Sequence, residues 1–159
     1  MRLLTIFFAL LLAAGGNPQS TRFETAMRNG QAAFEKKQLG QAEKYFKTAL
    51  KEAERAGLRR GEWAEAIERL ADVHIAQRKY ADAERLYERV LNSREKGPGA
   101  SRASLAQSFD DLGDLYGAQG RPTEADRLHA RAKEIRDKML AVHPEVYVDG
   151  QPKTVRPLP

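Results

Sequence analysis

The sequence predicts an all-α fold, an α-solenoid of three stacked helix–turn–helix repeats, and three observations lead to that prediction. Apolar residues recur at steps of three and four, as helices require, and glycine and proline cluster between those stretches. Three series of mostly small or aromatic residues also recur 41 and 42 residues apart: Ala42, Ala83 and Ala125; Phe46, Tyr87 and His129; Gly30, Ala71 and Gly113. Because a short helical pair cannot bury its own apolar face, such copies stack on one another.

The first sixteen residues stand apart from the repeats. Arg2 precedes an apolar run from Leu3 to Ala14, interrupted only by Thr5, and small residues follow up to Gly16. This order is typical of a secretory signal peptide. The run is shorter than the roughly 20 residues that span a bilayer, so residues 1–16 are predicted to be cleaved. An uncleaved membrane anchor is the alternative. We therefore expect an exported protein, periplasmic or secreted.

The composition excludes several classes of function. The chain has a formal charge of +5 and 31% charged residues, but the two signs alternate along the helices, as in Glu43 and Lys47. That pattern is typical of a solvated helix face, whereas nucleic-acid binding needs a patch of one sign. No cysteine is present, which excludes thiolate catalysis and disulfides. We predict no catalytic, cofactor-binding or metal-binding residue.

The first repeat is expected at about residues 22–56. Thr21 and Glu24 form a capping-box pattern that predicts the start of a helix, which runs to about Lys37. Leu39-Gly40 is expected to break it. A second helix should then run from Gln41 to about Arg55, where Gly57 lies in the position that glycine favours after a helix.

The second repeat is expected at about residues 62–95. A helix is predicted over 62–77 and another over 81–93, joined by a turn at residues 78–80. The second of these helices has apolar residues at helical spacing: Ala83, Leu86, Tyr87, Val90 and Leu91. Trp63, at the start of the repeat, is interpreted as a packing residue rather than a ligand platform.

The third repeat is expected at about residues 102–142. Residues 96–99 (Lys-Gly-Pro-Gly) form the clearest loop in the chain, and Ser101 or Ser104 can cap the helix that follows. That helix should end near Gln119. Pro122 suits the first turn of the last helix, which is predicted to run to about Val142.

The last residues, 143–159, are predicted to form an extended tail. Residues 146–148 followed by Asp149-Gly150 favour a short strand and a tight turn, with Thr154-Val155 as the return strand. No polar capping helix follows the third repeat. The tail could therefore fold back over the last helix, or that side could be an interface.

These residues resemble the tetratricopeptide repeat, in which helix A carries a small residue and an aromatic one, and helix B carries alanine, an aromatic residue and alanine. The third copy fits best: Leu112-Gly113, Tyr116, Gly120, Ala125, His129 and Ala132. The period of about 42 exceeds the usual 34 and, together with residues 132–140, is similar to the kinesin-light-chain subtype. His74 and His129 replace aromatic residues, and we expect them to pack rather than to bind metal.

The resemblance covers about residues 22–144 and implies a three-repeat domain over 17–142 that forms a right-handed superhelix and binds another protein. In this family, helix A of each repeat lines a concave groove. The corresponding positions are Glu24, Met27, Gln31, Phe34, Glu65, Glu68, Asp72, Ile75, Gln107, Asp110, Asp114 and Gly117. Six are carboxylates, and none is basic, so the lysine, arginine and asparagine clamp of the best-known peptide-binding members is absent.

Two interpretations of these carboxylates remain open. The groove could attract a basic or amine-bearing segment, with the apolar groove residues adding contact. Alternatively, the carboxylates only keep the helix face hydrated, with Arg28 and Arg69 neutralising some of them. An assembly subunit that self-associates through its open solenoid end, without a dedicated groove, is the alternative function.

Overall fold

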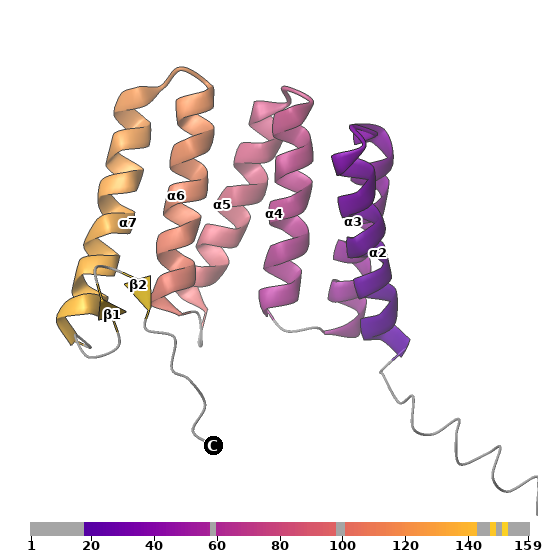
Figure 1. The fold of residues 1–159 in the computed structure, drawn as a ribbon, viewed down its shortest axis with the longest axis horizontal. Coiled ribbons are helices and arrows are strands. Elements are labelled where there is room, and N and C mark those ends of the chain that lie inside the picture. The colour runs from indigo at the N-terminus through magenta and orange to yellow at the C-terminus, as the bar shows by residue number, and fades with distance from the viewer. Residues whose placement is uncertain (1–17, 58–59, 98–100, 143–146, 149–150, 153–159) are drawn as a thin grey trace, which may run out of the picture. The chain divides into compact units, whose positions relative to one another are not determined.

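The computed structural model describes residues 18–57, 60–97, 101–142, 147–148 and 151–152. The chain divides into two compact units, residues 1–77 and residues 78–159. Figure 1 labels their helices and strands. The predicted signal peptide, residues 1–16, lies outside the described residues. Among the described residues, no helix has both the length and the apolar character needed to cross a membrane.

The described part of the first unit contains three helices: α2 (Pro18–Glu35), α3 (Leu39–Ala56) and α4 (Arg60–Ala76). The predicted capping box is wrong, because α2 begins three residues before Thr21. Proline suits the first helical turn, since its φ is already helical and it has no amide hydrogen to leave unbonded. Thr21 and Glu24 therefore lie within α2 rather than at its cap.

The turns of the first unit differ in part from the prediction. The chain reverses at Lys37, which has a φ of 58°, and Leu39 and Gly40 form the first turn of α3 instead of breaking a helix. Gly57 follows α3 in the left-handed conformation, and its amide donates to the carbonyl oxygens of Ala53 and Glu54, as the sequence led us to expect.

The core of the first unit is built mainly from alanine. Phe23 and Ala26 of α2 pack with Ala49 and Ala53 of α3 and Ala66 of α4. The larger side chains of Met27, Leu50 and Trp63 pack around this cluster, so the interpretation of Trp63 as a packing residue is confirmed.

Three helices are also described in the second unit: α5 (Tyr80–Lys96), α6 (Arg102–Ala118) and α7 (Pro122–Val142). Ser101 is the N-cap of α6, and its side chain accepts a hydrogen bond from the backbone amide of Ser104. Of the two predicted caps, Ser101 is therefore the one used. Gly120, with a φ of 75°, forms the turn between α6 and α7.

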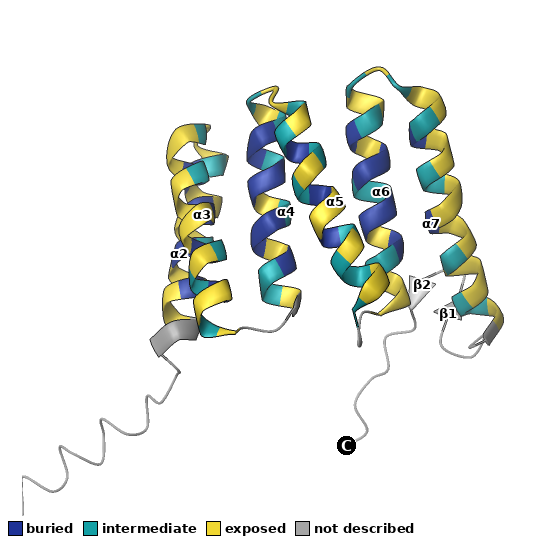
Figure 2. Ribbon diagram, turned by 180° about the vertical axis from the view of Figure 1, so that it is seen from behind, coloured by how far each residue is buried: buried dark blue, intermediate teal, exposed yellow. Residues whose placement is uncertain are grey.

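The core of the second unit lies between these helices. Ala106, Phe109 and Ala132 are buried together, and a ring of partly buried side chains packs against them: Leu91, Leu105, Leu128 and Ile135. Ser108 is also buried, and its hydroxyl accepts a hydrogen bond from the guanidinium of Arg94 at 2.6 Å. Figure 2 shows more buried residues on α6 than on α7, which is mostly exposed.

Two short strands follow α7: β1 (Tyr147–Val148) and β2 (Gln151–Pro152). They pair antiparallel, with Tyr147 opposite Pro152 and Val148 opposite Gln151. The predicted strand is confirmed over Tyr147–Val148, and its partner strand is Gln151–Pro152. The predicted tight turn at Asp149-Gly150 lies outside the described residues. The predicted return at Thr154-Val155 lies outside the described residues.

The periodic small and aromatic residues meet within each unit. In the first unit, a Cβ atom added to Gly30 of α2 would lie 2.6 Å from Cε1 of Phe46 in α3. In the second unit, a Cβ atom added to Gly113 of α6 would lie 2.8 Å from Cε1 of His129 in α7. The two helices of a hairpin thus approach closely where glycine faces a ring.

Replacing Gly30 with alanine should lower the stability of the protein. Because Phe46 is only 1% exposed, its ring cannot move aside, and overpacking of this kind costs about 1–3 kcal/mol. Thermal unfolding followed by circular dichroism measures the effect. Gly117→Ala is the control, since nothing lies within 4 Å of its added Cβ atom, and it should be neutral or slightly stabilising. Equal melting temperatures for the two variants would contradict the close approach.

Candidate functional site

Eight of the predicted groove residues lie in the first unit, on α2 and α4. Three of them, Met27, Gln31 and Glu65, line one small cavity of about 250 Å³. Arg28, Phe46 and Arg69 complete the lining of this cavity. The structure therefore brings residues of two predicted helix A segments together around a shared hollow.

The charges around this hollow are mixed rather than uniformly acidic. The α2–α4 face, defined here by the predicted groove residues on these helices together with Arg28 and Arg69, carries four carboxylates: Glu24, Glu65, Glu68 and Asp72. Arg69 donates to Asp72 at 3.4 Å, and Arg28 lies at the hollow. Four negative and two positive charges give this face a net charge of −2.

The remaining residues of the face are polar or partly apolar. The side-chain amide of Gln31 donates a hydrogen bond of 2.9 Å to Glu35, one turn further along α2. Phe34 and Ile75 are half-buried, as is Met27, and each leaves part of an apolar side chain accessible. Apolar contact and negative charge are therefore both available on the α2–α4 face.

In the second unit, the predicted residues Gln107, Asp110 and Asp114 lie on α6. Asp110 accepts from Arg136 of α7 at 2.5 Å, and His129 Nδ1 lies 3.3 Å from its other oxygen. Burial would raise the pKa of Asp110, but the hydrogen bonds and charges of Arg136 and His129 outweigh it and lower the pKa. Asp110 therefore has partners of its own within the unit.

Asp114 differs from Asp110 in its exposure. Its side chain is 79% exposed, and one of its oxygens lies 3.5 Å from Nε2 of His129. Gln107 donates to Asp111 at 2.8 Å. His129 thus lies between two carboxylates, which explains why a histidine is accepted where the repeat usually has an aromatic residue. The described residues contain no group of three or more side chains arranged to hold a metal ion.

A second polar cluster was not predicted from the sequence. Tyr116 of α6 donates to Glu84 of α5 at 2.7 Å, and the guanidinium carbon of Arg121 lies 4.0 Å from the centre of the Tyr116 ring. The hydrogen bond to Glu84, aided by burial, raises the pKa of Tyr116 to about 12. Arg121 also pairs with Glu124 at the start of α7. This cluster joins all three helices of the second unit.

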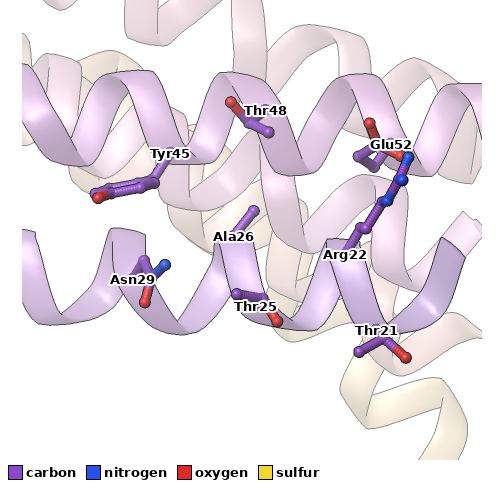
Figure 3. A pocket seen from close by; sticks show the side chains of 8 residues that line it. All are labelled: Thr21, Arg22, Thr25, Ala26, Asn29, Tyr45, Thr48 and Glu52. Atoms are coloured by element: carbon purple, nitrogen blue, oxygen red, sulfur yellow. The ribbon is translucent and has the colours of Figure 1, made fainter. Parts of the chain in front are cut away.

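A cavity larger than the one between α2 and α4 was also missed. It has a volume of about 810 Å³ and lies between α2 and α3 (Figure 3). A hollow of about 230 Å³ continues it, since both contain Asn29 and Tyr45. We call the two together the α2–α3 trough, lined by Thr21, Arg22, Thr25, Ala26, Asn29, Ala32, Ala33, Lys36, Gln38, Gln41, Tyr45, Thr48 and Glu52.

Replacing Asp110 with asparagine should reduce the loss of stability that the protein shows as the pH falls into the acid range. Because the pKa of Asp110 is lowered in the folded state, the stability it contributes is present above the ordinary carboxyl pKa and is lost as pH falls below it. Melting temperatures measured from neutral to acid pH should fall less steeply in the variant. Arg136→Gln should flatten the curve in the same way, and the double variant should add little. Parallel curves for wild type and Asp110→Asn would contradict the pairing.

Comparisons with known proteins agree with this architecture. Residues 63–138 match the family model for the tetratricopeptide repeat. No curated protein matches the chain. Among solved structures, 16 chains match, and the crystal structure of the TPR domain of Arabidopsis FLU has a TM-score of 0.66 at 18% identity, covering 76% of this chain and 99% of that one.

BtubC (BKLC) from P. vanneervenii has a TM-score of 0.64 at 24% identity. The match covers 88% of this chain but only 53% of BtubC, so the chain spans about half the length of that protein. At these identities the likeness shows the fold alone. The predicted fold class, an all-α solenoid of helix–turn–helix repeats, is confirmed. Over residues 63–138, this chain is similar to the tetratricopeptide repeat family.

Proposed function

We propose that the protein is an exported scaffold that binds another protein through the α2–α4 face. The observation that carries the proposal is the hollow between two helix A segments of one unit, which is lined by Met27, Arg28, Gln31, Phe46, Glu65 and Arg69. The tetratricopeptide repeat is in general a non-catalytic scaffold fold that binds other proteins. The likeness to that family supports a role in binding rather than in catalysis.

The chemistry of the face favours a partner segment that is basic and partly apolar. Glu24 and Glu65 are exposed, and the face keeps a net charge of −2 after both arginines are included. Such a surface attracts a lysine- or arginine-bearing segment and repels an acidic one. The accessible parts of Met27, Phe34 and Ile75 would contact its apolar side chains.

The alternative, in which the carboxylates only hydrate the helices, is supported in the second unit. There Asp110 is bonded to Arg136 and His129, and this leaves it less available to a partner. The proposed binding face is therefore narrower than the predicted groove, and we restrict it to α2 and α4.

Reversing the charge of the face should abolish partner binding. The bait is the exported, processed protein, and the variant is Glu24→Lys with Glu65→Lys. Asp72 and Asp110 stay unchanged, because each is bonded to an arginine. A protein captured from the native envelope fraction should be retained by the wild type, lost by the variant and released by salt, which screens surface charges.

The control variant changes the same number of carboxylates elsewhere. Glu88→Lys with Glu95→Lys alters two exposed carboxylates of α5 and should leave capture unchanged. Capture that is equal for the two variants, or that is insensitive to salt, would count against a charged α2–α4 face.

We also propose that the first sixteen residues direct export and are then removed. The apolar run ends at the small residues before Asn17, where cleavage is expected. Mass spectrometry of the protein from its native compartment should give a mature chain that begins at or near Asn17. Recovery of the full-length mass from the membrane fraction would favour an uncleaved anchor.

A further inference from the structure

The α2–α3 trough occupies a position that holds a helix in the other repeats. Shifted by 41 residues, trough residues Arg22, Thr25, Asn29 and Ala32 correspond to four residues of α4: Trp63, Ala66, Leu70 and Val73. Trp63 and Ala66 pack in the core with Ala49 and Ala53 of the preceding helix α3, and Leu70 and Val73 are buried. In the second unit, the corresponding face belongs to α6, the helix A that comes after α5 in the chain. The shape of the trough therefore fits the helix B of another repeat.

One contact between α3 and α4 defines the register of this packing. Gln77, directly after α4, donates through Nε2 to Glu43 of α3 at 3.0 Å. The corresponding acid of the next repeat, Glu84 of α5, accepts from Tyr116 of α6 at 2.7 Å. In each unit, an acid near the start of a helix B thus accepts a hydrogen bond from the segment that follows it, although Tyr116 lies three residues before Gln119, the equivalent of Gln77.

The positions of Glu43 and Gln77 have equivalents in the third and first repeats. The third acid of the series is Asp126 of α7, 42 residues after Glu84, and it is exposed. The residue equivalent to Gln77 in the first repeat is Lys36, which lies 41 residues earlier and lines the trough. Lys36 and Gln77 both follow the last residue of a helix and precede a residue with a left-handed φ, Lys37 and Arg78 respectively.

We propose that the trough binds α7 of a second copy of this chain, with Lys36 of one copy paired with Asp126 of the next. In that arrangement, α7 of one copy packs on α2 of its neighbour in the same way that α3 packs on α4 within one chain. The ion pair between Asp126 and Lys36 then takes the place of the Gln77–Glu43 hydrogen bond. The charges are complementary at this position, which is the observation that selects a second copy as the occupant.

The rest of the interface fits a weak and salt-sensitive contact. Lys133 of α7 is the equivalent of Leu50, which packs against the core of the first unit. Its ammonium group forms an ion pair with Asp137 at 2.6 Å. The trough presents threonine, asparagine and glutamine side chains together with several alanines and the ring of Tyr45. Because two different surfaces meet, copies add head to tail, into a ring or an open filament.

The test uses two single charge reversals, Lys36→Glu and Asp126→Lys, in the processed protein. Sedimentation velocity at low salt, over a wide range of protein concentration, should show that the wild type associates. Each variant alone should stay monomeric, because like charges then meet across the contact. An equimolar mixture of the two variants should associate again, since each supplies the opposite charge that the other needs.

The mixture separates loss of the contact from loss of folding, because misfolded variants would not recover on mixing. Arg102→Glu with Glu95→Lys alters two exposed charges outside the contact and should associate like the wild type. A wild type that is monomeric at every concentration overturns the proposal. So does association that survives both reversals, or a mixture that stays monomeric.

Discussion

The close approach of two helices at a glycine is the constraint on which both units depend. Where Gly30 meets Phe46, and where Gly113 meets His129, a missing Cβ atom makes room for a ring. The contact fixes how far apart the helices of a hairpin lie and how they are rotated about their own axes. The rotation in turn decides which side chains of α2 and α6 face the neighbouring helix and which face the surface, where a partner could reach them.

This constraint also explains why the predicted groove carboxylates have different partners in the two units. On α6, Asp110 lies one turn before Gly113, so the rotation that brings Gly113 to His129 also brings Asp110 to α7 and to Arg136. On α2 the equivalent position holds Met27, which has no charge to neutralise. The carboxylates of α4 lie beside Arg69 and near Arg28, so the first unit keeps a weaker but still negative face.

The sequence was sufficient to predict features that depend on local pattern. The helices, the cap at Ser101 and the turn at Gly57 follow from spacing and from residue chemistry close along the chain. The pairing of Asp110 with Arg136 could not be predicted, because the two residues are 26 positions apart and meet only when α6 and α7 pack. The α2–α3 trough was missed for a similar reason, since polar residues at the end of an array give no periodic apolar pattern. The start of α2 was misjudged because Pro18 and Thr21 both favour a helix start.

The turn at Lys37 has a consequence for how the protein responds to ionic strength. Each α-helix has a partial negative charge at its C-terminal end, from carbonyl groups without helical partners. Lys36 and Lys37 follow α2, and Arg78 lies just beyond α4. Positively charged side chains therefore lie at the C-terminal end of each of these helices. Dissolved ions screen that attraction as they screen contacts with other molecules. The ionic strength of the surroundings therefore acts on the helices themselves as well as on what they bind.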